Sequence, residues 1–504
     1  MLNTSRELEV KLLFPAEKLQ SIENFIISKG GARRQRLQAA YIDTPDFLLS
    51  KSGIAFRIRR EGRHWVQTLK VSTANALERI EHNVILDTHG SDIPQWSINL
   101  HQEHQAGLLF KQLLPNLSID DLQIRYQTDI WRRKVDVNTR SGVLEYALDQ
   151  GVIFANHPDG VRKEQVQELE IELKQGHAAD VLRHAQVMVK RFKAYIDTRS
   201  KSERGYLLAC GVEVSPAKRA ETIALKKLSS KQDVVNLLLD ACLGQVLSNQ
   251  SVLSTNHEAY DEHLHQLRVG LRRLKTLLKY LSHFEINLSE SGTKALGDIF
   301  SKLGQYRDDN YVTETLNPLL ISHNGPPIEI GAVTALPHPN SLIRSPIFQL
   351  LLLEMMSLGL APMPEEEVTQ KSDKQMSAVK KPIFKILNKT FRFTVDQAAK
   401  LSDLEDEAIH TLRKKLKFLR YSLEFFKDIC NRERFKPFFK LLTVTLDHLG
   451  QFNDICVAIS RIELMTASDP RLFFALGWLK AERLRLRGLC EKSLKALFLT
   501  KPAW

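Results

Sequence analysis

The chain has 504 residues, a length that suits two to four domains of roughly 100–200 residues each. Lys and Arg number 71 against 59 Asp and Glu, a formal net charge of +12, and the hydrophobic share of 43% excludes a wholly disordered chain. No run approaches about 18 consecutive apolar residues, and the first ten residues lack the apolar core of a secretory signal, so we expect a cytoplasmic protein with no membrane span. The five cysteines include no CxxC pair, which disfavours a disulfide framework or a zinc knuckle.

Up to about residue 210, charged and apolar residues alternate in short runs, a pattern typical of half-buried strands. In chain order, this pattern and two stretches of helical spacing predict a strand at 6–12, a helix at 15–29, strands at 55–59, 65–71, 81–86, 131–137, 143–148 and 168–173, and a helix at 180–192. We therefore expect an α+β domain over residues 1–210, with seven or eight antiparallel strands in a barrel or sandwich.

The chain changes character after residue 210. Residues 211–227 have the composition of a linker, and over 228–504 apolar residues recur at three- and four-residue spacing, which predicts an all-α domain. The segment that starts at His265 resembles the one that starts at His410, an offset of 145 residues. The segment at 303–308 resembles the one at 449–454, an offset of 146 residues. Two matches in the same order at nearly the same offset indicate a duplicated helical bundle.

Like charges repeat on single faces of the predicted strands. Glu168, Glu170 and Glu172 share one face of a strand, and Arg57 and Arg59 share one face of another. Each strand by itself fits an ordinary solvated face, but three aligned carboxylates repel one another unless cations bind them. A closed barrel with these charges inside would join an acidic wall suited to Mg²⁺ or Mn²⁺ with a basic wall suited to phosphate oxygens, as phosphoryl transfer requires. No glycine-rich phosphate loop is present, which disfavours the common nucleotide-binding folds.

The N-terminal residues Glu7-x-Glu9-x-Lys11 resemble the ExExK signature of the CYTH superfamily, the triphosphate tunnel metalloenzymes. The resemblance covers residues 5–208, and its other matching positions are Tyr41 to Pro45, Phe56 to Arg59, Thr68 to Lys70, Arg79 to Glu81, Trp131-Arg132, Leu144 to Asp149, Glu168 to Leu173 and Ser200-Lys201. The duplicated helices resemble the CHAD domain over about 226–495. The chain is thus similar to bacterial CYTH–CHAD inorganic triphosphatases. This resemblance implies an eight-stranded antiparallel β tunnel barrel with flanking helices, followed by the duplicated helical bundle.

The CYTH resemblance also implies a role for individual residues of the tunnel. One metal ion, Mg²⁺ or Mn²⁺, would be held by Glu9, Glu170 and Glu172, and a second metal ion or the attacking water by Glu7, Glu81, Glu145 and Asp149. The residues expected to act in the chemical step are Glu7, Glu81, Lys70 and Arg132. The residues expected to bind the triphosphate are Lys11, Arg57, Arg59, Lys70, Arg79, Arg132 and Lys201.

Two of the predicted helices carry a basic stripe at helical spacing. The stripes consist of His265, Arg268, Arg272 and Lys275 on one helix, where Lys279 continues the same row, and of His410, Arg413, Lys417 and Arg420 on the other. A solvated helix face explains any single stripe equally well, whereas the CHAD resemblance implies that both bind polyphosphate. Nucleic acid would satisfy the same charges, but no aromatic residues are interleaved for base stacking, so it is disfavoured.

The expected activity is the divalent-metal-dependent hydrolysis of inorganic triphosphate to pyrophosphate and phosphate, with polyphosphate bound by the helical domain. One alternative is another triphosphate chemistry, either hydrolysis of thiamine or nucleoside triphosphate or a class IV-type adenylyl cyclase. The other alternative is a polyphosphate-binding protein without enzymatic activity. The many carboxylates argue against this last alternative, because pure anion binding gains nothing from an acidic wall.

Overall fold

The computed structural model describes residues 6–72, 78–86, 90, 92–225, 231–255, 261–311, 316–327, 338–360, 372–401, 404–463 and 472–504. Backbone contacts divide the chain into two compact units. The first consists of Met1–Ala220, Asp240–Gly270 and Asn340–Leu360, and the second of Glu221–Leu239, Leu271–Pro339 and Ala361–Trp504.

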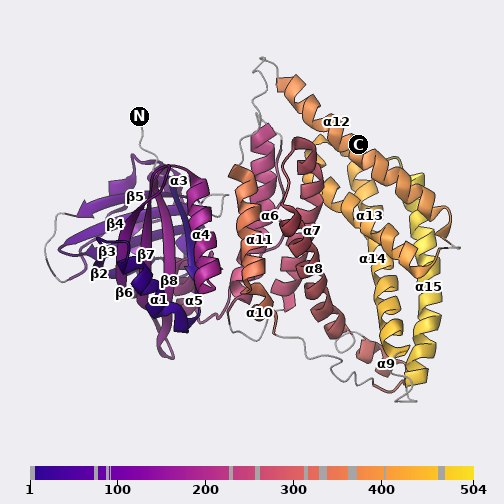
Figure 1. Cartoon of the computed structure of the whole chain (residues 1–504), viewed down its shortest axis with the longest axis horizontal. Helices are drawn as coiled ribbons and strands as arrows, with labels where there is room; N and C mark the ends of the chain where they lie inside the picture. Colours follow the sequence, from indigo (N-terminus) through magenta and orange to yellow (C-terminus); the bar gives the residue numbers. More distant parts are fainter. Residues whose placement is uncertain are drawn as a thin grey trace. The chain divides into compact units, whose positions relative to one another are not determined.

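The first unit is built on an antiparallel sheet that closes into a barrel (Figure 1). Its strands are β1 (Arg6–Leu13), β2 (Arg33–Asp43), β3 (Ile54–Glu61), β4 (His64–Ser72), β5 (Glu78–Leu86), β6 (Gln123–Asn138), β7 (Val143–His157), β8 (Gly160–Gln175) and β9 (Tyr195–Ile196). The strand order is β5-β4-β3-β2-β6-β7-β8-β1-β9, and β5 also pairs with β1, so β1 to β8 form a closed ring. The predicted α+β fold with an antiparallel barrel is confirmed, and a ninth strand of two residues is added beside β1.

The sequence patterns did not predict strands β2 and β9, and the structure gives a physical reason for each. In β2, five of the residues from Leu37 to Ile42 are buried, so both faces are covered and no alternation of polar and apolar residues is visible. Strand β9 is too short to carry any pattern. The strand predicted at 168–173 begins eight residues earlier, at Gly160.

Along several strands, alternation separates an apolar outer face from a charged inner face. On β3, Phe56 and Ile58 are buried under the outer helix α3 (Gln105–Leu113), together with other apolar residues of β4 and β5. Helix α4 (Ala178–Phe192) covers β1 and β8 from outside, and α1 (Leu19–Ile27) contacts β6. Because successive side chains of a strand point to opposite faces, the charged residues between these apolar positions face the interior of the barrel.

Helix α5 (Lys201–Cys210) packs against inward-facing residues of β6, β7 and β8. Its first turn is capped by Ser200, whose Oγ accepts a hydrogen bond from the backbone N–H of Glu203 at 3.0 Å. A Cβ atom at Gly205 would lie 2.2 Å from the ring of Tyr126, which is itself stacked on Tyr41 at 4.7 Å between ring centroids. The close approach of α5 to β6 therefore requires a glycine at this position. The short helix α2 (Leu48–Lys51) also contacts α5.

The first unit also contains helical segments from the second half of the chain. They are the part of α6 (Lys231–Leu253) from residue 240, the part of α7 (Asp261–Leu281) up to residue 270, α10 (Pro339–Ile343) and α11 (Pro346–Ser357). Helix α11 contacts both α4 and β9, so these segments complete the outer packing of the barrel (Figure 1).

In its described residues, the second unit forms helices and no strand. Its further helices are α8 (Glu290–Tyr311), α9 (Asn317–Ser322), α12 (Ser372–Ala398), α13 (Asp406–Phe425), α14 (Arg432–Glu463) and α15 (Leu472–Leu499). The repeated segments lie on α7 and α8 and again, in the same order, on α13 and α14. Tyr280 of α7 stacks on Phe418 of α13 with 5.7 Å between ring centroids. Among the described residues, no helix has the length and apolar character needed to cross a membrane.

Candidate active site

The barrel encloses a cavity of about 980 Å³ that is lined mainly by charged and polar side chains. Among the described residues, eight acidic side chains line it: Glu9, Glu61, Glu81, Glu145, Asp149, Glu170, Glu172 and Glu203. Eight basic side chains line it as well: Lys11, Arg57, Arg59, Lys70, Arg132, Lys134, Lys174 and Lys201. The formal charges of the two sets cancel, so a highly charged anion is stabilised here only if additional cations enter with it.

The structure brings most of the predicted tunnel residues together in this one cavity. Twelve of the fourteen line it: Glu9, Lys11, Arg57, Arg59, Lys70, Glu81, Arg132, Glu145, Asp149, Glu170, Glu172 and Lys201. The side chains of the other two, Glu7 and Arg79, lie outside the described part of the structure, although their backbones pair across β1 and β5. The roles assigned to all fourteen stay predictions.

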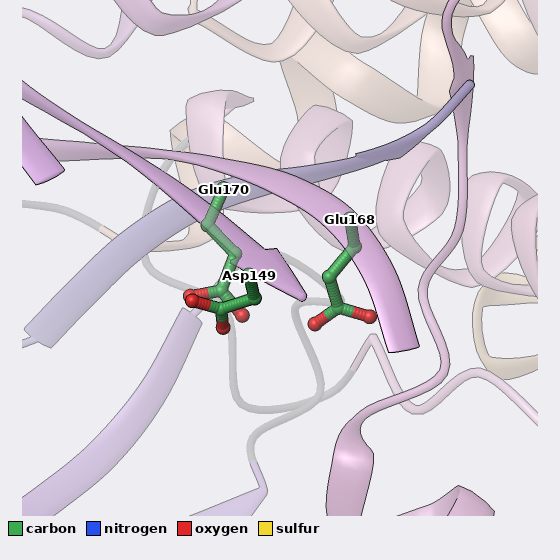
Figure 2. Close-up of side chains that lie close together, drawn as sticks. All are labelled: Asp149, Glu168 and Glu170. Carbon is green, nitrogen blue, oxygen red and sulfur yellow. The ribbon is translucent and has the colours of Figure 1, made fainter. Parts of the chain in front are cut away.

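One end of the cavity holds a cluster of three carboxylates around a lysine. Asp149 of β7 and Glu168 and Glu170 of β8 point toward one place (Figure 2). The Nζ atom of Lys201 lies 2.7 Å from Asp149 Oδ2 and 2.8 Å from Glu170 Oε1, and it also contacts Glu168. Burial acts to lower the pKa of Lys201, but the three carboxylates outweigh it and hold the pKa above its usual value. The ammonium group therefore occupies the position at which these carboxylates would otherwise hold a metal ion.

The same carboxylates fix Arg132 of β6. Its Nε and Nη2 atoms donate to Asp149 at 2.7 and 2.6 Å, and Nη2 lies 2.5 Å from Glu170 Oε2. Burial acts to raise the pKa of Glu170, yet Lys201, Arg132 and Lys11 together hold it well below its usual value. Glu170 thus stays ionised and keeps two of the predicted phosphate-binding cations in place.

The opposite wall concentrates positive charge. Arg57 Nη2 lies 3.8 Å from Glu81 Oε1, Lys70 also contacts Glu81, and Arg59 contacts Glu61. Burial lowers the pKa of Arg59, and repulsion from Arg57 and Arg132 lowers it further against the effect of Glu61. Burial acts to raise the pKa of the adjacent Tyr41 hydroxyl, but Arg57, Lys201 and Arg59 bring it below its usual value. An anion placed here would relieve the mutual repulsion of these cations.

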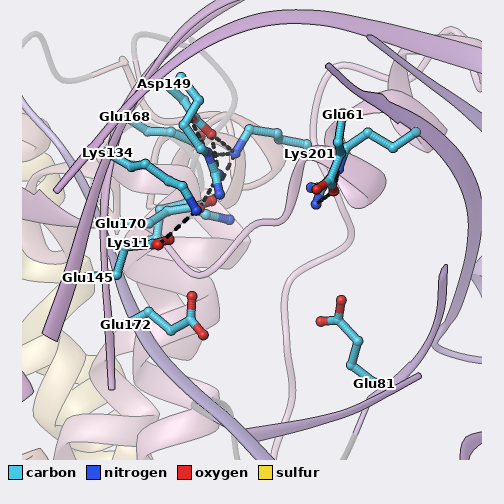
Figure 3. Close-up of polar contacts among 12 residues, drawn as sticks. Lys11, Glu61, Glu81, Lys134, Glu145, Asp149, Glu168, Glu170, Glu172 and Lys201 are labelled. Carbon is cyan, nitrogen blue, oxygen red and sulfur yellow. Dashed lines mark hydrogen bonds and ion pairs between the residues drawn. The ribbon is translucent and has the colours of Figure 1, made fainter. Parts of the chain in front are cut away.

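A second group of carboxylates lies on three neighbouring strands. Glu172 of β8 is directly opposite Glu9 of β1 and Glu145 of β7 in the strand register. Figure 3 shows Glu145 and Glu172 on one side of the interior and Glu81 on the other. Burial raises the pKa of Glu172, and Glu145 and Glu9 add to the shift against the effect of Lys174, which lies 2.7 Å from Glu172. A divalent cation would remove this repulsion, and carboxylate oxygens suit Mg²⁺ or Mn²⁺.

A metal ion can displace the lysines that lie beside these carboxylates. Lys134 Nζ lies 3.1 Å from Glu145, and the side chains of Lys134 and Lys174 are 38% and 41% exposed. Ion pairs of such exposed lysines contribute little stability, in contrast to the buried contacts of Lys201. Among the described residues, the carboxylates whose oxygens converge to within 4.8 Å of one another are Asp149, Glu168 and Glu170, where Lys201 lies. A divalent cation at Glu9, Glu145 and Glu172 would require these three side chains to turn toward one another.

Sequence reasoning missed several charged residues of the site. Lys134, Lys174 and Glu61 each lie two residues beyond a predicted site residue, on the same face of its strand. Including the next alternate residue of each predicted strand face would have identified all three. Arg204 donates from Nη1 to Glu168 Oε2 at 3.0 Å. It lies on α5, where no strand pattern points to it.

On the helices, the structure places basic residues of α7 and α13 close together. Burial lowers the pKa of Lys275, and Arg272 and Lys414 lower it further. Burial likewise lowers the pKa of Lys279, and Lys415 and Lys275 add to this effect. Lys279 continues the predicted stripe of α7, whereas Lys414 and Lys415 were not among the predicted residues.

The eight predicted residues on these helices differ in accessibility. Arg413 is buried with 8% exposure, Arg420 Nε lies 3.1 Å from Glu424, and His410 contacts Asn453. His265 is exposed, and Arg268, Arg272, Lys275 and Lys417 are partly buried. Their role in binding polyphosphate stays a prediction.

Comparisons with known proteins find one domain family that matches the N-terminal part of the chain and a second that matches the helical part. The CYTH domain family matches residues 5–206, and the CHAD domain family matches residues 237–463. The resemblance inferred from the sequence motifs is thus confirmed for both domains.

Individual relatives match parts of the chain. An inorganic triphosphatase of Haemophilus influenzae is 29% identical over 171 residues, which are 33% of this chain and 44% of that protein. The match thus spans less than half the length of the relative. Among solved structures, the CHAD domain of the plant Ricinus communis is 22% identical with a TM-score of 0.44, covering 56% of this chain and 97% of that one. A putative adenylate cyclase of Bacillus halodurans is 20% identical with a TM-score of 0.27, covering 36% and 88%.

Proposed function

Because the chain carries a CYTH domain followed by a CHAD domain, we propose that it hydrolyses inorganic triphosphate to pyrophosphate and phosphate in the cavity of the barrel. The reaction depends on a divalent cation, Mg²⁺ or Mn²⁺, and takes place in the cytoplasm. The name of the Haemophilus influenzae relative supports triphosphate as the substrate. The CHAD domain binds polyphosphate.

One observation carries the proposal: in a single cavity, some cations are crowded against other cations and some carboxylates against other carboxylates. Burial lowers the pKa of Arg59, with repulsion from Arg57 and Arg132 adding to the shift, and burial raises the pKa of Glu172, with repulsion from Glu145 and Glu9 adding to it. An anion relieves the first strain and a divalent cation relieves the second. A complex of triphosphate with a divalent cation supplies both in one ligand.

The basic residues bind the phosphate oxygens from two sides. Arg57, Arg59 and Lys70 act from β3 and β4, because guanidinium and ammonium groups match phosphate oxygens in charge and geometry. Arg132 and Lys201 act from the other wall. Since Asp149 and Glu170 already hold these two cations, no reorganisation is needed as charge develops on the leaving group.

In the chemical step, water attacks the terminal phosphorus, the bond from phosphorus to the bridging oxygen breaks, and pyrophosphate leaves. Glu81 accepts the proton of the water. It lies in the cavity wall beside Arg57 and Lys70. Phosphate oxygens would compete with Glu81 for these two cations, which would leave the carboxylate available as a base. Asn83 donates to Glu81 Oε1 at 2.9 Å and holds the carboxylate in position.

Glu9, Glu145 and Glu172 would hold the divalent cation. When bound, it would neutralise non-bridging phosphate oxygens and orient the substrate. The CYTH resemblance assigns Glu170 to the same metal, but in this structure Glu170 contacts Arg132 and Lys201. Glu170 therefore serves mainly to position these two cations.

The test is phosphate release from a panel of inorganic triphosphate, thiamine triphosphate, ATP and pyrophosphate, each with Mg²⁺, with Mn²⁺ and with excess chelator. We expect phosphate and pyrophosphate in equal amounts from inorganic triphosphate, and no product in the chelator. Cyclic AMP and pyrophosphate from ATP would point to a cyclase. Binding of triphosphate without turnover in any metal would point to a protein without enzymatic activity, and full hydrolysis in chelator would contradict the metal site.

The polyphosphate proposal depends on the basic residues that α7 and α13 bring together. Burial lowers the pKa of Lys275 and Lys279, and repulsion from Lys414 and Lys415 of α13 adds to the two shifts. A linear polyanion would neutralise both helices at once and release its counterions.

A further inference from the structure

Strand β9 lies at an open edge of the sheet, where its outward-facing backbone groups need partners. Ile196 is paired with Leu12 of β1 on one side. On the other side, two glutamine side chains take the place of a neighbouring strand. The Ile196 N–H donates to Gln349 Oε1 at 2.9 Å, and Gln250 Nε2 donates to the Ile196 carbonyl at 2.8 Å.

The two glutamines form one buried unit with the helices that carry them. Gln349 Nε2 donates to Gln250 Oε1 at 3.2 Å and to the carbonyl of Ile343 at 2.7 Å, and both glutamine side chains are fully buried. Ser251, the next residue of α6, accepts a hydrogen bond from the Thr198 N–H at 3.0 Å. Buried hydrogen bonds of this kind are costly to leave unmade, so they fix the backbone of residues 196–198.

The segment held in this way supplies two parts of the candidate active site. The carbonyl of Arg199 accepts a hydrogen bond from Lys11 Nζ at 2.8 Å. Two residues later, Lys201 enters the carboxylate cluster of Asp149 and Glu170. Within the same segment, Asp197 and Arg199 form a buried ion pair, with 2.7 Å between Oδ2 and Nη2. This ion pair keeps the segment compact. A displacement of Ile196 is therefore passed on to two predicted phosphate-binding lysines.

A second lining segment is attached to the same helices. Ser215 and Pro216 line the cavity, and the Ser215 carbonyl contacts Nε2 of His263 on α7 at 2.9 Å. The side chain of Asn249 on α6 accepts a hydrogen bond from the Lys218 N–H at 3.2 Å and donates one to the Lys218 carbonyl at 2.9 Å. Asn249 and His263 lie within the CHAD match, as do Gln250 and Gln349.

We propose that Gln250 and Gln349, although they belong to the CHAD domain, are positioning residues of the CYTH active site. They act through the backbone of Ile196 and fix the place of Lys11 and Lys201, and they touch no substrate. The inference rests on the proposed triphosphatase activity, to which it adds that the CHAD helices are part of the machinery that binds triphosphate.

The test compares three full-length variants: Gln250→Met, Gln349→Met and the control Gln245→Met. Methionine keeps the length of the side chain and removes its hydrogen bonds. Gln245 is a matched control, because it is equally buried on α6 but its Nε2 donates to Gln266 of α7 at 3.0 Å. Triphosphate hydrolysis is measured at a temperature at which calorimetry shows all variants to be folded.

We expect kcat/KM to fall about tenfold or more in Gln250→Met and Gln349→Met, with a raised KM, and to stay within about twofold in Gln245→Met. A purely structural role would lower the unfolding temperature of all three and leave KM unchanged below it. An unchanged KM in the first two variants, or an equal loss in the control, would overturn the proposal.

Backbone hydrogen exchange of residues 196–204 separates this proposal from the proposed function. If the unmodified chain releases no phosphate, the proposed function is wrong, and exchange alone decides the inference. Faster exchange at Asp197, Arg199 and Glu203 in the two variants but not in the control would support it. Identical exchange rates in all chains would overturn it.

Discussion

At the scale of single residues, neighbours decide the chemistry of identical side chains. Glu170 and Glu172 lie two residues apart on the same face of β8. Contacts with Lys201 and Arg132 lower the pKa of Glu170, whereas burial and the nearby Glu145 and Glu9 raise that of Glu172. The charge of one glutamate is therefore stabilised by the basic side chains that it contacts, whereas the charge of the other is opposed by its surroundings.

The arginines of β3 allow a direct test of triphosphate binding. Arg59→Ala should raise KM for triphosphate and lower kcat, because its guanidinium contacts phosphate oxygens in both the ground state and the transition state. Arg36→Ala is the control, since Arg36 is half exposed and bonds Asp129 at 2.8 Å instead of lining the cavity. An unchanged KM in both Arg57→Ala and Arg59→Ala would show that these side chains do not bind the substrate.

His101 makes the stability of the barrel depend on pH. The Gln67 side chain donates from Nε2 to the Ser97 carbonyl and accepts at Oε1 from the Ser97 N–H. The remaining N–H of Gln67 donates to His101 Nε2. His101 in turn donates from Nδ1 to Nδ1 of His82 at 2.9 Å. This network requires a neutral imidazole. Burial, with help from His82 and His104, lowers the pKa of His101 to about 4.

The unfolded chain, in which histidine has a pKa of about 6.5, therefore binds more protons between pH 6.5 and pH 4. The contribution of the neutral His101 to the free energy of unfolding is fully present above pH 6.5. It should fall by up to about 3 kcal/mol as the pH drops to 4. Unfolding temperatures measured across this range should depend less on pH in His101→Gln. Parallel curves for the two proteins would refute this assignment.

At the scale of elements, helix α5 connects the apolar filling of the barrel with the charged cavity. Its residues Leu207 and Ala209 are buried, and its first residue, Lys201, lies among the carboxylates. The position of the helix depends on the contact between Gly205 and Tyr126. Packing at one point of the helix thus sets the geometry of a charge about one turn away.

Gly205→Ala should displace α5 and cost about 1–3 kcal/mol of stability, because the Tyr126 ring is held by Tyr41 and cannot move aside. Gly244→Ala on α6 is the matched control. A Cβ there meets no atom within 4 Å, and alanine should stabilise the helix by roughly 0.5–1 kcal/mol. Calorimetry should show opposite shifts of the unfolding temperature, and a shift of the same sign in both would contradict the packing argument.

Helices α7 and α13 carry the prediction for polyphosphate. Replacing Lys275, Lys279, Lys414 and Lys415 together by Gln should weaken binding of long-chain polyphosphate and flatten its salt dependence, because fewer counterions are released. Triphosphate hydrolysis should persist. The control replaces Lys436, Lys440, Lys492 and Lys495, four exposed lysines of α14 and α15, and removes the same charge. Equal losses in both variants would mean that net charge alone governs binding.

At the scale of the whole molecule, the compact units do not follow the order of the sequence. Asp240–Gly270 and Asn340–Leu360 belong to the unit of the barrel, although both lie largely within the CHAD match. Helix α11 contacts α4 and β9, and its Phe348 and Leu352 are fully buried. The barrel thus depends in part on α11, which begins 150 residues after the end of its last strand.

A fragment of residues 1–220 should therefore unfold at a lower temperature than the barrel does in the full-length chain. It loses the apolar cover of α4 and the partners of the Ile196 backbone groups. Calorimetry of the fragment and of the full-length chain tests this expectation. Equal unfolding temperatures would mean that the CHAD helices add no stability to the barrel.

The sequence by itself determined the charged inner face of the barrel. A strand has a period of two, so the spacing of Glu9 and Lys11, or of Arg57 and Arg59, places both side chains on one side wherever the strand lies. The same reasoning extends to Lys134 and Lys174, which line the cavity as well. The helical repeat likewise followed from local spacing.

Only the tertiary structure decided which of these charges neutralise one another. Lys201 lies among Asp149, Glu168 and Glu170 because α5 folds back against β7 and β8, and no local pattern encodes that contact. The partners of Ile196, Gln250 and Gln349, are 54 and 153 residues away from it. Long-range packing selects such pairs through burial and shape, which act only when the chain is folded, whereas periodicity is already fixed by the backbone geometry of each element.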